Sequence, residues 1–421
     1  MKRFARSIVG IILGWQVRRL QKKHSFTTVA VVGSIGKTST KFAIAQVLGE
    51  SLRVRFQSGN YNDYVSVPLV AFGLDMPSLF NPFAWLAAFI RCELQIHKTY
   101  PYDVVVLELG TDGPGQIAAF GKYLHVDIAV LTSVAPEHME FFADLDEVAK
   151  EELSVIQFSK QLVLNADLVA KEYRSLVPEA LSYSLHEESN YKISNFKFVA
   201  DGVKFELDRD GEPLISADHS GISEPHLYSL TAAAAVADLL ELHQEAIIKG
   251  FEHVKPVSGR MQRLDGIKGS TIIDDSYNAS PEAVKAALET LYRIESSKKI
   301  ALLGNMNELG DFSVDAHTKI GNFCDPKQLS EVITLGPDAN EHLAPAAELQ
   351  GCKVTRFTTP YEAGEYLGQI VSDGAVVLVK GSQNRVYAEE AIKSILANPA
   401  DEGKLVRQSS SWLKKKAQNF R

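Results

Sequence analysis

The stretch VAVVGSIGKTSTKFAIAQVL, from Val29 to Leu48, joins an apolar run to a glycine-bearing turn and then to a helix-like pattern. The apolar run at Thr27–Val32 predicts a buried strand, and Lys37–Leu48 predicts a helix that begins directly after the turn. A strand, a tight turn and a helix in this order provide the setting of a phosphate-binding loop. The stretch therefore predicts an α/β domain that binds a phosphorylated ligand at one edge of its sheet.

Further apolar runs follow, separated by helical patterns, and each is typical of a strand that is covered on both faces. These predicted strands are Val54–Gln57, Tyr102–Gly110, His125–Val134 and Gln161–Asp167. Strands that alternate with helices predict a doubly wound, mostly parallel sheet. Between residues 183 and 216, apolar and polar residues alternate around the pairs Asp201-Gly202 and Asp210-Gly211, which predicts a small antiparallel β element.

The length of 421 residues and a second series of strands indicate more than one domain. The second series starts near Ser258 with STIIDD, KIALLG, VITLG, KVTRF and AVVLVKGS, a pattern that is typical of a Rossmann-like domain. We expect four parts along the chain. They are a basic amphipathic leader at 1–26, a central P-loop ATPase domain at 27–257, a Rossmann-like C-terminal domain at 258–398 and a basic tail at 399–421.

Charge is distributed unevenly along the chain. The net charge is −8, yet residues 1–49 contain no Asp or Glu, and the residues after Glu402 carry only basic charges. The acidic middle argues against a general nucleic-acid binder.

The cysteines, Cys92, Cys324 and Cys352, lack metal-ligand spacing, so we expect reduced thiols in a cytoplasmic protein.

Two apolar segments bear on contact with a membrane. The run Ser7–Trp15 is shorter than the roughly 20 apolar residues that a membrane span needs. Three interpretations of the leader stay open: a helix on the inner face of the membrane, a helix packed on its own protein, and a secretion signal. The second segment, Asn81–Ile96, begins with Pro82 and contains Arg91, and we expect a buried helix there.

The turn GSIGKTST, Gly33–Thr40, supplies the chemistry of a phosphate site. Its glycines allow backbone N–H groups to converge on phosphate oxygens, and the helix N-terminus adds positive potential. The Lys37 ammonium can reach the β- and γ-phosphates, and the Thr38 or Ser39 hydroxyl can bind Mg²⁺. We therefore predict that ATP or GTP is bound by Gly33, Ser34, Gly36, Lys37, Thr38 and Ser39.

A phosphate loop also needs a partner for the metal ion. Glu108 ends a predicted parallel strand, where an acidic side chain can face a bound nucleotide. His138 follows the next strand after a proline-bearing turn, and we predict a metal-binding role for it. A single histidine is more often structural, and that alternative stays open.

Several longer motifs occur in order along the chain. In the first half they are GSIGKTST, GNYNDYVSVPL (Gly59–Leu69), LELGTDGPGQI (Leu107–Ile117) and SVAPEHMEFF, and in the second half SGR (Ser258–Arg260), DDSYNASPEAVKAAL (Asp274–Leu288), LLGNMNELG (Leu302–Gly310) and VKGSQN (Val379–Asn384). With these motifs the sequence resembles the Mur ligase family, the ATP-dependent amide ligases of peptidoglycan precursor synthesis. DDSYNASP and GNMNELG resemble the branch that joins D-alanyl-D-alanine to a UDP-muramoyl tripeptide.

The resemblance implies a reaction and a set of site residues. The γ-phosphoryl group of ATP passes to a substrate carboxylate, an amine attacks the resulting acyl phosphate, and an amide forms. By the same resemblance, Thr38 and Glu108 hold one Mg²⁺ and His138 holds a second. Arg260 is then expected to approach the phosphates.

In the second half, the resemblance implies that Asp274, Tyr277 and Asn278 hold the nucleotide or an interface that closes on it. Lys380 of VKGSQN and His317, which accompanies LLGNMNELG, also belong to the family's motifs. Plain structural alternatives stay open for several of these positions. Asp274 and Asp275 could form a solvated strand end, and Asn278 could be an ordinary turn or cap residue. Lys380 could be a surface lysine, and His317 a histidine on a helix surface.

The sequence departs from the family pattern at several positions. Where the family carries a carbamylated lysine after the histidine motif, this chain has Glu152, whose carboxylate can serve a metal ion without CO₂. A shifted register would place Lys150 there instead. We also expect the N-terminal UDP-sugar domain of this branch to be missing. Ser66, Asn305 and Gln383 replace a usual Gly, Asp and Arg, which leaves the amine substrate open.

The leading hypothesis is an ATP-dependent carboxylate–amine ligase that acts on a peptidoglycan precursor and an amine acceptor. One alternative keeps the chemistry and changes the substrate, as in a folylpolyglutamate-type peptide extension. Another is a non-catalytic nucleotide-binding scaffold of wall synthesis. The presence of Lys37, Glu108 and His138 argues against the scaffold, which has little need for them.

Overall fold

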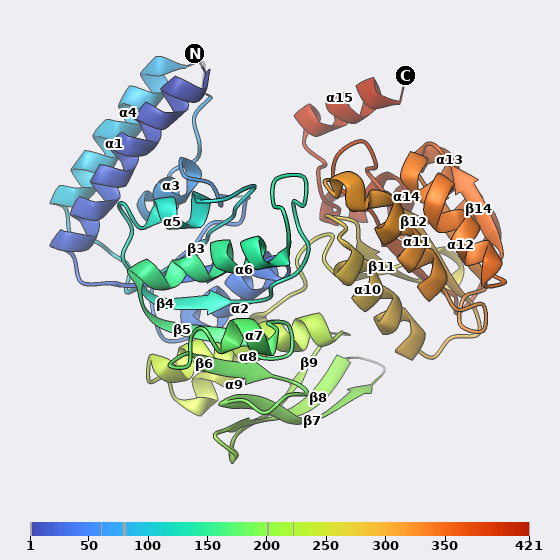
Figure 1. Cartoon of the computed structure of the whole chain (residues 1–421), viewed down its shortest axis with the longest axis horizontal. Coiled ribbons are helices and arrows are strands. Elements are labelled where there is room, and N and C mark those ends of the chain that lie inside the picture. The colour runs from blue at the N-terminus through green and yellow to red at the C-terminus, as the bar shows by residue number, and fades with distance from the viewer. Residues whose placement is uncertain (1, 60, 79–80, 200–201, 222, 421) are drawn as a thin grey trace. The chain divides into compact units, whose positions relative to one another are not determined.

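The chain forms two compact units in the computed structural model (Figure 1). One unit comprises Met1–Ala135 and Phe141–Lys255, and the other comprises Pro136–Glu140 and Pro256–Arg421. The structure describes residues 2–59, 61–78, 81–199, 202–221 and 223–420. Asn60 of the GNYNDYVSVPL motif and Asp201 of the first Asp-Gly turn lie outside the described residues.

A single sheet runs through the first unit, in the order β2-β3-β1-β4-β5-β6-β7-β8-β9. Its parallel strands are β1 (Thr27–Val32), β2 (Val54–Arg55), β3 (Val104–Glu108), β4 (Val126–Leu131), β5 (Ser159–Asn165) and β6 (Leu181–Ser184). The strands predicted from the apolar runs are thus confirmed. The run predicted at Val54–Gln57 forms only a two-residue strand at the sheet edge.

The predicted antiparallel element is confirmed as an extension of this same sheet. It consists of β7 (Tyr191–Val199), β8 (Gly202–Arg209) and β9 (Glu212–His219). Along β8 the residues alternate between buried and exposed, because only one face of this part is covered.

Helices cover both faces of the parallel part, as the doubly wound prediction requires (Figure 1). On one face, α2 (Lys37–Gly49), α8 (Glu224–Leu239) and α9 (Gln244–His253) form a common core with the sheet. The run Ala232–Ala237 on α8 is fully buried, since its small side chains let α2 and α8 approach closely. The remaining elements are α3 (Ser66–Phe72), α5 (Gln116–Phe120), α6 (Leu145–Leu153), η1 (Ser154–Phe158) and α7 (Lys171–Arg174).

The leader forms α1 (Lys2–Lys23), which packs on α3 and on α4 (Pro82–His97) of its own unit. α1 buries Leu13, Val17 and Leu20. The expectation that α4 is buried is wrong for its outer side, where Phe83, Leu86, Ile90 and Leu94 are exposed. No helix within the described parts of the chain is both long enough and apolar enough to cross a bilayer.

The second unit is a separate α/β layer structure with the strand order β10-β11-β15-β12-β13-β14. The strands are β10 (Gln262–Asp265), β11 (Thr271–Asp275), β12 (Lys299–Gly304), β13 (Glu331–Leu335), β14 (Val354–Phe357) and β15 (Val376–Lys380). All pairs are parallel except β10 with β11, so the Rossmann-like prediction is confirmed. Its helices are α10 (Pro281–Arg293), α11 (Ser313–Phe323), α12 (Ala344–Leu349), α13 (Pro360–Ile370) and α14 (Glu389–Lys393), with short turns η2 (Ile267–Gly269), η3 (Gly310–Phe312) and η4 (Ala339–Leu343).

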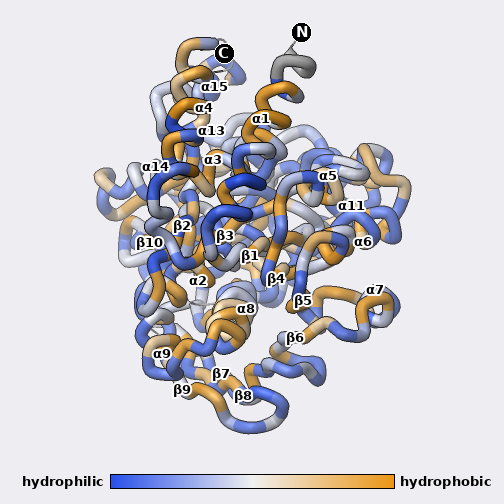
Figure 2. The backbone as a smooth tube through the Cα atoms, turned by 90° about the vertical axis from the view of Figure 1, so that its left-hand side faces the viewer, coloured by the Kyte–Doolittle hydropathy of each residue, from blue (hydrophilic) through white to orange (hydrophobic). Residues whose placement is uncertain are grey.

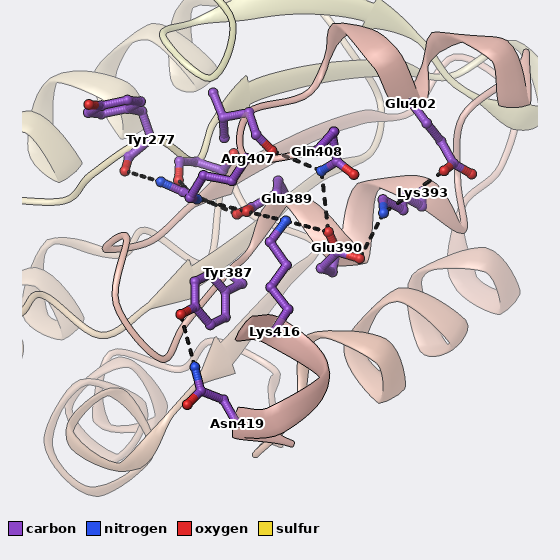
Figure 3. A network of polar contacts seen from close by, with 12 residues as sticks. Tyr277, Tyr387, Glu389, Glu390, Lys393, Glu402, Arg407, Gln408, Lys416 and Asn419 are labelled. Atoms are coloured by element: carbon purple, nitrogen blue, oxygen red, sulfur yellow. Dashed lines mark hydrogen bonds and ion pairs between the residues drawn. The ribbon is translucent and has the colours of Figure 1, made fainter. Parts of the chain in front are cut away.

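The basic tail is folded, with η5 (Pro399–Lys404) and α15 (Ser410–Asn419). Buried ion pairs hold it to α14 (Figure 3). The Lys416 ammonium lies 2.8 Å from Glu389 Oε1 and 2.6 Å from Glu390 Oε1. Arg407 pairs with Glu389 Oε2 at 2.7 Å. Basic residues in this tail therefore neutralise carboxylates inside the unit instead of only covering its surface.

Candidate active site

Three strand ends of the first unit meet at one edge of its sheet. β1 pairs with β3 so that Val31 lies opposite Glu108, and with β4 so that Val32 lies opposite Leu131. The segments that follow these strands are therefore neighbours. The carboxyl edge of a parallel sheet is where ligands of α/β domains bind.

The first of these segments is the GSIGKTST loop. At two positions its backbone has a conformation that favours glycine. Gly33 has φ +122° and Gly36 has φ +89°. A Cβ on Gly33 would collide with the Thr132 hydroxyl and lie 2.8 Å from the Ser133 nitrogen. Gly33 is thus required by the close approach of this loop to the end of β4, and Gly36 by its positive φ.

Hydrogen bonds fix the loop against the residues that follow β4. The Ser133 hydroxyl accepts from the Ile35 N–H at 2.7 Å, and the Thr132 hydroxyl donates to the Ile35 carbonyl at 2.6 Å. Ser34 is buried, and its hydroxyl accepts from the Ala135 N–H at 3.0 Å. The Ser34 side chain is therefore a structural anchor of the loop.

Lys37 opens helix α2 and bends back over the loop. Its ammonium donates to the carbonyls of Gly33 and Ser34, the latter at 3.2 Å. The first turn of α2 contains no acidic residue, and Thr38 and Ser39 of this turn are half-buried. A lysine ammonium beside a helix N-terminus is an arrangement that attracts phosphate.

Glu108 stands next to the first turn of α2. Its Oε1 accepts from the Thr38 hydroxyl at 3.1 Å, and its Oε2 lies 3.0 Å from the Lys41 ammonium. Both Glu108 and Lys41 are almost completely buried, so each neutralises the other. Sequence reasoning found Glu108 from its place at a strand end but missed Lys41.

Glu152 also reaches the loop. It is buried on α6, and its Oε2 accepts from the Gly33 N–H at 2.8 Å. Lys150, the alternative in the other register, is exposed to solvent. The neighbouring Glu151, which sequence reasoning missed, accepts from the N–H groups of Gly115 and Ile117 at 2.6 Å each and so holds the start of α5.

The donor set around the loop suits a nucleotide with Mg²⁺. It offers the Thr38 hydroxyl and the carboxylates of Glu108 and Glu152, which are hard oxygen ligands of the kind that Mg²⁺ prefers. Within the described ranges, no three His, Cys, Asp or Glu side chains are gathered closely enough to hold a metal ion by themselves. Mg²⁺ usually keeps several water or phosphate oxygens, so a site completed by phosphate needs fewer protein ligands.

His138 belongs to the second unit and contacts a residue of that unit. Its Nδ1 lies 3.0 Å from Glu308 Oε2, and its Nε2 lies 3.6 Å from Glu137. The hydrogen bond from His138 lowers the pKa of Glu308. His138 and Glu308 both have positive φ, at 53° and 66°, which is a strained conformation for residues other than glycine.

Asp274, the last residue but one of β11, is completely buried, so the alternative of a solvated strand end is wrong for this residue. Its Oδ1 accepts from the N–H of Ser276 at 3.0 Å and from the Ser276 hydroxyl. Its Oδ2 has no hydrogen-bond partner among the described residues. Burial raises the pKa of Asp274 to about 6. The side chain thus shapes the loop that follows β11 from inside the unit.

The other residues of this loop are held by two cations. Lys380 is buried, so the alternative of a surface lysine is wrong, and it lies 2.6 Å from Asp275 Oδ2. It also donates to the Asn278 carbonyl at 2.9 Å. The half-buried Tyr277 ring has the Arg260 guanidinium 4.2 Å from its centroid, a cation–π contact.

Two further predicted positions lie inside the second unit. His317 is completely buried and its Nε2 accepts from the Met306 N–H at 3.0 Å, so the alternative of a surface histidine is wrong. Burial lowers the pKa of His317, and the ring is therefore neutral. Asn305, one of the departures from the family pattern, uses its Oδ1 to accept from the Ala339 N–H at 2.9 Å.

Comparison with known proteins matches both units. The family model of the Mur ligase middle domain matches residues 87–237, and that of the Mur ligase glutamate ligase domain matches residues 259–383. The UDP-N-acetylmuramoyl-tripeptide–D-alanyl-D-alanine ligase of Bacillus subtilis is 25% identical over 379 residues, which are 88% of this chain and 76% of that protein. Its namesake from Haemophilus influenzae is 26% identical over 404 residues, 91% of this chain and 80% of that protein.

Solved structures agree with this result. MurF ligase from Thermotoga maritima, in complex with ADP, has a TM-score of 0.76 and 25% identity, and the match covers 93% of this chain and 84% of that chain. MurF from Acinetobacter baumannii has a TM-score of 0.74 at 22% identity and shares the fold, with 90% of this chain and 79% of that chain covered. The ordered motifs, the two folds and these matches agree: the chain belongs to the Mur ligase family.

Proposed function

We propose that this protein is an ATP-dependent carboxylate–amine ligase that adds D-alanyl-D-alanine, or a similar amine, to a muramoyl-peptide precursor of peptidoglycan. The observation that carries the proposal is the glycine-constrained loop with Lys37 above it and the Thr38–Glu108 pair beside it. Relatives that match most of this chain are named as ligases of this reaction, and one solved relative contains ADP.

The loop residues have distinct roles in this proposal. The N–H groups at the start of α2 and the Lys37 ammonium bind the phosphates, and Thr38 and Glu108 hold Mg²⁺. The nucleotide transfers its γ-phosphoryl group to a substrate carboxylate, which yields an acyl phosphate and ADP. The amine then attacks the acyl carbon, phosphate leaves, and an amide forms. Positive charge around the loop neutralises the charge that develops during this transfer, and no nucleophilic side chain is needed.

In the second unit we propose that Arg260 approaches the phosphates and that Tyr277 and Asn278 contact the nucleotide. The buried Asp274 then acts indirectly, by fixing Ser276 at the start of their loop. His138 is proposed as a ligand of a second Mg²⁺, and its strained backbone supports a functional constraint on its position. Burial of neutral His317 supports only a structural role for that residue.

We further propose that Glu152 supplies the carboxylate that a carbamylated lysine supplies elsewhere in the family. The Glu152 carboxylate is buried and accepts a hydrogen bond from the Gly33 N–H, which supports this role. Lys150, in contrast, is exposed to solvent. Calorimetric titration of Mg²⁺ and ADP should show weaker Mg²⁺-dependent binding for Glu152→Gln, because the amide keeps the size of the side chain but removes its charge. Adding or removing bicarbonate should leave wild-type binding unchanged, and a bicarbonate dependence that Lys150→Ala abolishes would contradict the assignment.

The function is tested by measuring phosphate release from ATP with Mg²⁺, UDP-muramoyl tripeptide and D-alanyl-D-alanine. We expect release only when all components are present, and loss of release in Lys37→Ala. An exposed change on the same unit, Lys150→Ala, is the matched control and should retain activity. Release that occurs without any amine, or with no muramoyl substrate, would overturn the proposed reaction, and release with a different amine would change only the acceptor.

A further inference from the structure

The outer side of the α1–α4 helix pair carries an unusual concentration of exposed apolar residues. These are Ile8, Ile11 and Trp15 on α1, and Phe83, Leu86, Ile90 and Leu94 on α4, with exposed fractions between 43% and 82%. Isolated exposed apolar residues are normal on a protein surface, but a contiguous apolar face marks a binding surface. We call these seven side chains the apolar face.

The two helices run in the same direction, and polar contacts fix their alignment. Gln16 donates to the Phe89 carbonyl at 2.9 Å, Arg19 pairs with Glu93 at 2.7 Å, and further along Lys23 lies 3.5 Å from His97. Figure 1 shows α1 and α4 side by side along their length.

Both apolar stripes lie on the same side of this pair. On α1 the buried residues Leu13, Val17 and Leu20 point to the body of the unit, and on α4 the buried residues Trp85 and Cys92 do so. With 3.6 residues per turn, the exposed residues at 8, 11 and 15 and those at 83, 86, 90 and 94 fall on the opposite side of each helix. The exposed stripes therefore form one continuous outward surface.

Basic residues lie toward the C-terminal ends of both helices. In Figure 2 the hydropathy colouring of α1 changes from hydrophobic to hydrophilic along the helix. The exposed residues Arg18, Lys22 and Lys23 follow the apolar residues of α1, and Arg91 and Lys98 accompany those of α4. Residues 1–49 contain no Asp or Glu. The acidic residue of α4, Glu93, is already paired with Arg19. The surface therefore combines apolar side chains with an excess of positive charge, which on α1 follows the apolar residues.

We propose that this surface docks the protein on a bilayer that contains anionic lipids. The apolar side chains enter the boundary between headgroups and acyl chains, and the basic residues contact the lipid phosphates. Trp15 lies between the apolar and basic residues of α1, and the Arg19 guanidinium is 4.4 Å from its ring centroid. Tryptophan is favoured at this depth of a membrane interface.

Charge distinguishes the membrane from a second copy of the chain. A symmetric dimer through this surface would set the basic residues of one copy against either the basic or the apolar residues of the other, and neither contact neutralises them. Anionic headgroups instead attract them, with each basic residue contributing about fivefold in partition near the surface. The inference does not depend on the ligase reaction, and its test needs no substrate.

The test is flotation of the full chain with vesicles of phosphatidylcholine alone or mixed with phosphatidylglycerol. We expect binding to the anionic vesicles, with weakening by salt and a blue shift of tryptophan fluorescence that Trp15→Phe removes. The double change Leu86→Glu with Ile90→Glu should abolish binding, and Arg18→Glu with Lys22→Glu should reduce it at least tenfold. Leu349→Glu, at an 85% exposed position of the second unit, is the matched control and should bind like the wild type.

Circular dichroism and ADP binding by each variant separate loss of docking from loss of folding. The proposal is overturned if well-folded wild type floats with neither kind of vesicle, or if the apolar and control variants bind equally. A concentration-dependent dimer in sedimentation that Leu86→Glu dissociates, without vesicle binding, would assign the surface to a second copy and also overturn it.

Discussion

Glu108 serves two groups of helix α2, the Thr38 hydroxyl and the Lys41 ammonium. Its position at the end of an apolar strand made it predictable from the sequence. Lys41 was not predictable, because a lysine four residues after Lys37 looks the same whether it faces solvent or the interior. Only the pairing of β1 with β3, which places Glu108 beside α2, reveals that the ammonium is buried.

Removal of the Lys41 charge should therefore destabilise the first unit. Lys41→Met leaves a buried carboxylate without its cation, and we expect a loss of about 3 kcal/mol or more in the free energy of unfolding. Unfolding by denaturant measures this loss. The exposed change Lys150→Met is the control, and its free energy of unfolding should lie within about 0.5 kcal/mol of the wild-type value. Equal stability of the two variants would show that Lys41 does not neutralise Glu108.

Asp274 should make the stability of the second unit depend on pH. Burial raises the pKa of Asp274 to about 6 in the folded state, above the ordinary aspartate value of 3.8, so the folded protein binds more protons than the unfolded chain between these values. Stability from this group is thus present at low pH and is lost as the pH rises from about 4 to about 6, by roughly 3 kcal/mol in total.

Asp274→Asn removes this titration. Unfolding measured across that pH range should show the variant gaining stability relative to wild type as the pH rises, because the amide remains neutral. Parallel profiles for the two proteins would contradict a raised pKa at this position.

Helix α15 is a basic element that places one of its charges inside its own unit. From its sequence it is a polar, basic tail, yet Lys416 lies at 1% exposure between Glu389 and Glu390 (Figure 3). Arg407, just before this helix, also donates to the carbonyls of Ser276 and Tyr277. The tail therefore supports the loop that carries Tyr277, which is one of the proposed nucleotide-binding residues.

Lys416→Met should release α15 from its unit. The change leaves two buried carboxylates with one fewer cation, so we expect a loss of about 3 kcal/mol in stability and faster proteolysis before residue 410. Lys414→Met, an exposed change on the same helix, should behave as wild type. Unchanged proteolysis of the Lys416 variant would mean that other contacts hold the helix.

Elements differed in how well their sequences predicted them. The strands β1, β3, β4 and β5 were predictable because strands buried on both faces are continuous apolar runs. Helix α4 was predicted as a helix, but its exposed outer side was not, since an apolar helix gives no sign of which side lacks a partner. The inward position of the tail was missed because charge normally marks a solvated surface.

At the scale of the whole molecule, each unit brings its own sheet and its own set of proposed ligand residues. The first provides the glycine-constrained loop with Lys37, Thr38, Glu108 and Glu152. The second provides the loop after β11 and the strained His138–Glu308 pair. The sequence predicted Lys37, Thr38, Glu108, Glu152 and His138 from the loop pattern, the strand ends and the motif order. Glu308 and the supporting partners Lys41, Glu151 and Arg407 emerged only from the tertiary contacts.

The proposed reaction requires that the loop before α2 binds a nucleotide. Calorimetry of the full chain with ADP and Mg²⁺ tests this directly. We predict saturable binding by wild type and an affinity lowered at least tenfold in Lys37→Ala, because a charge-assisted hydrogen bond to phosphate contributes about 2 kcal/mol. Absence of binding by folded wild type, or equal affinity in the two proteins, would contradict the account.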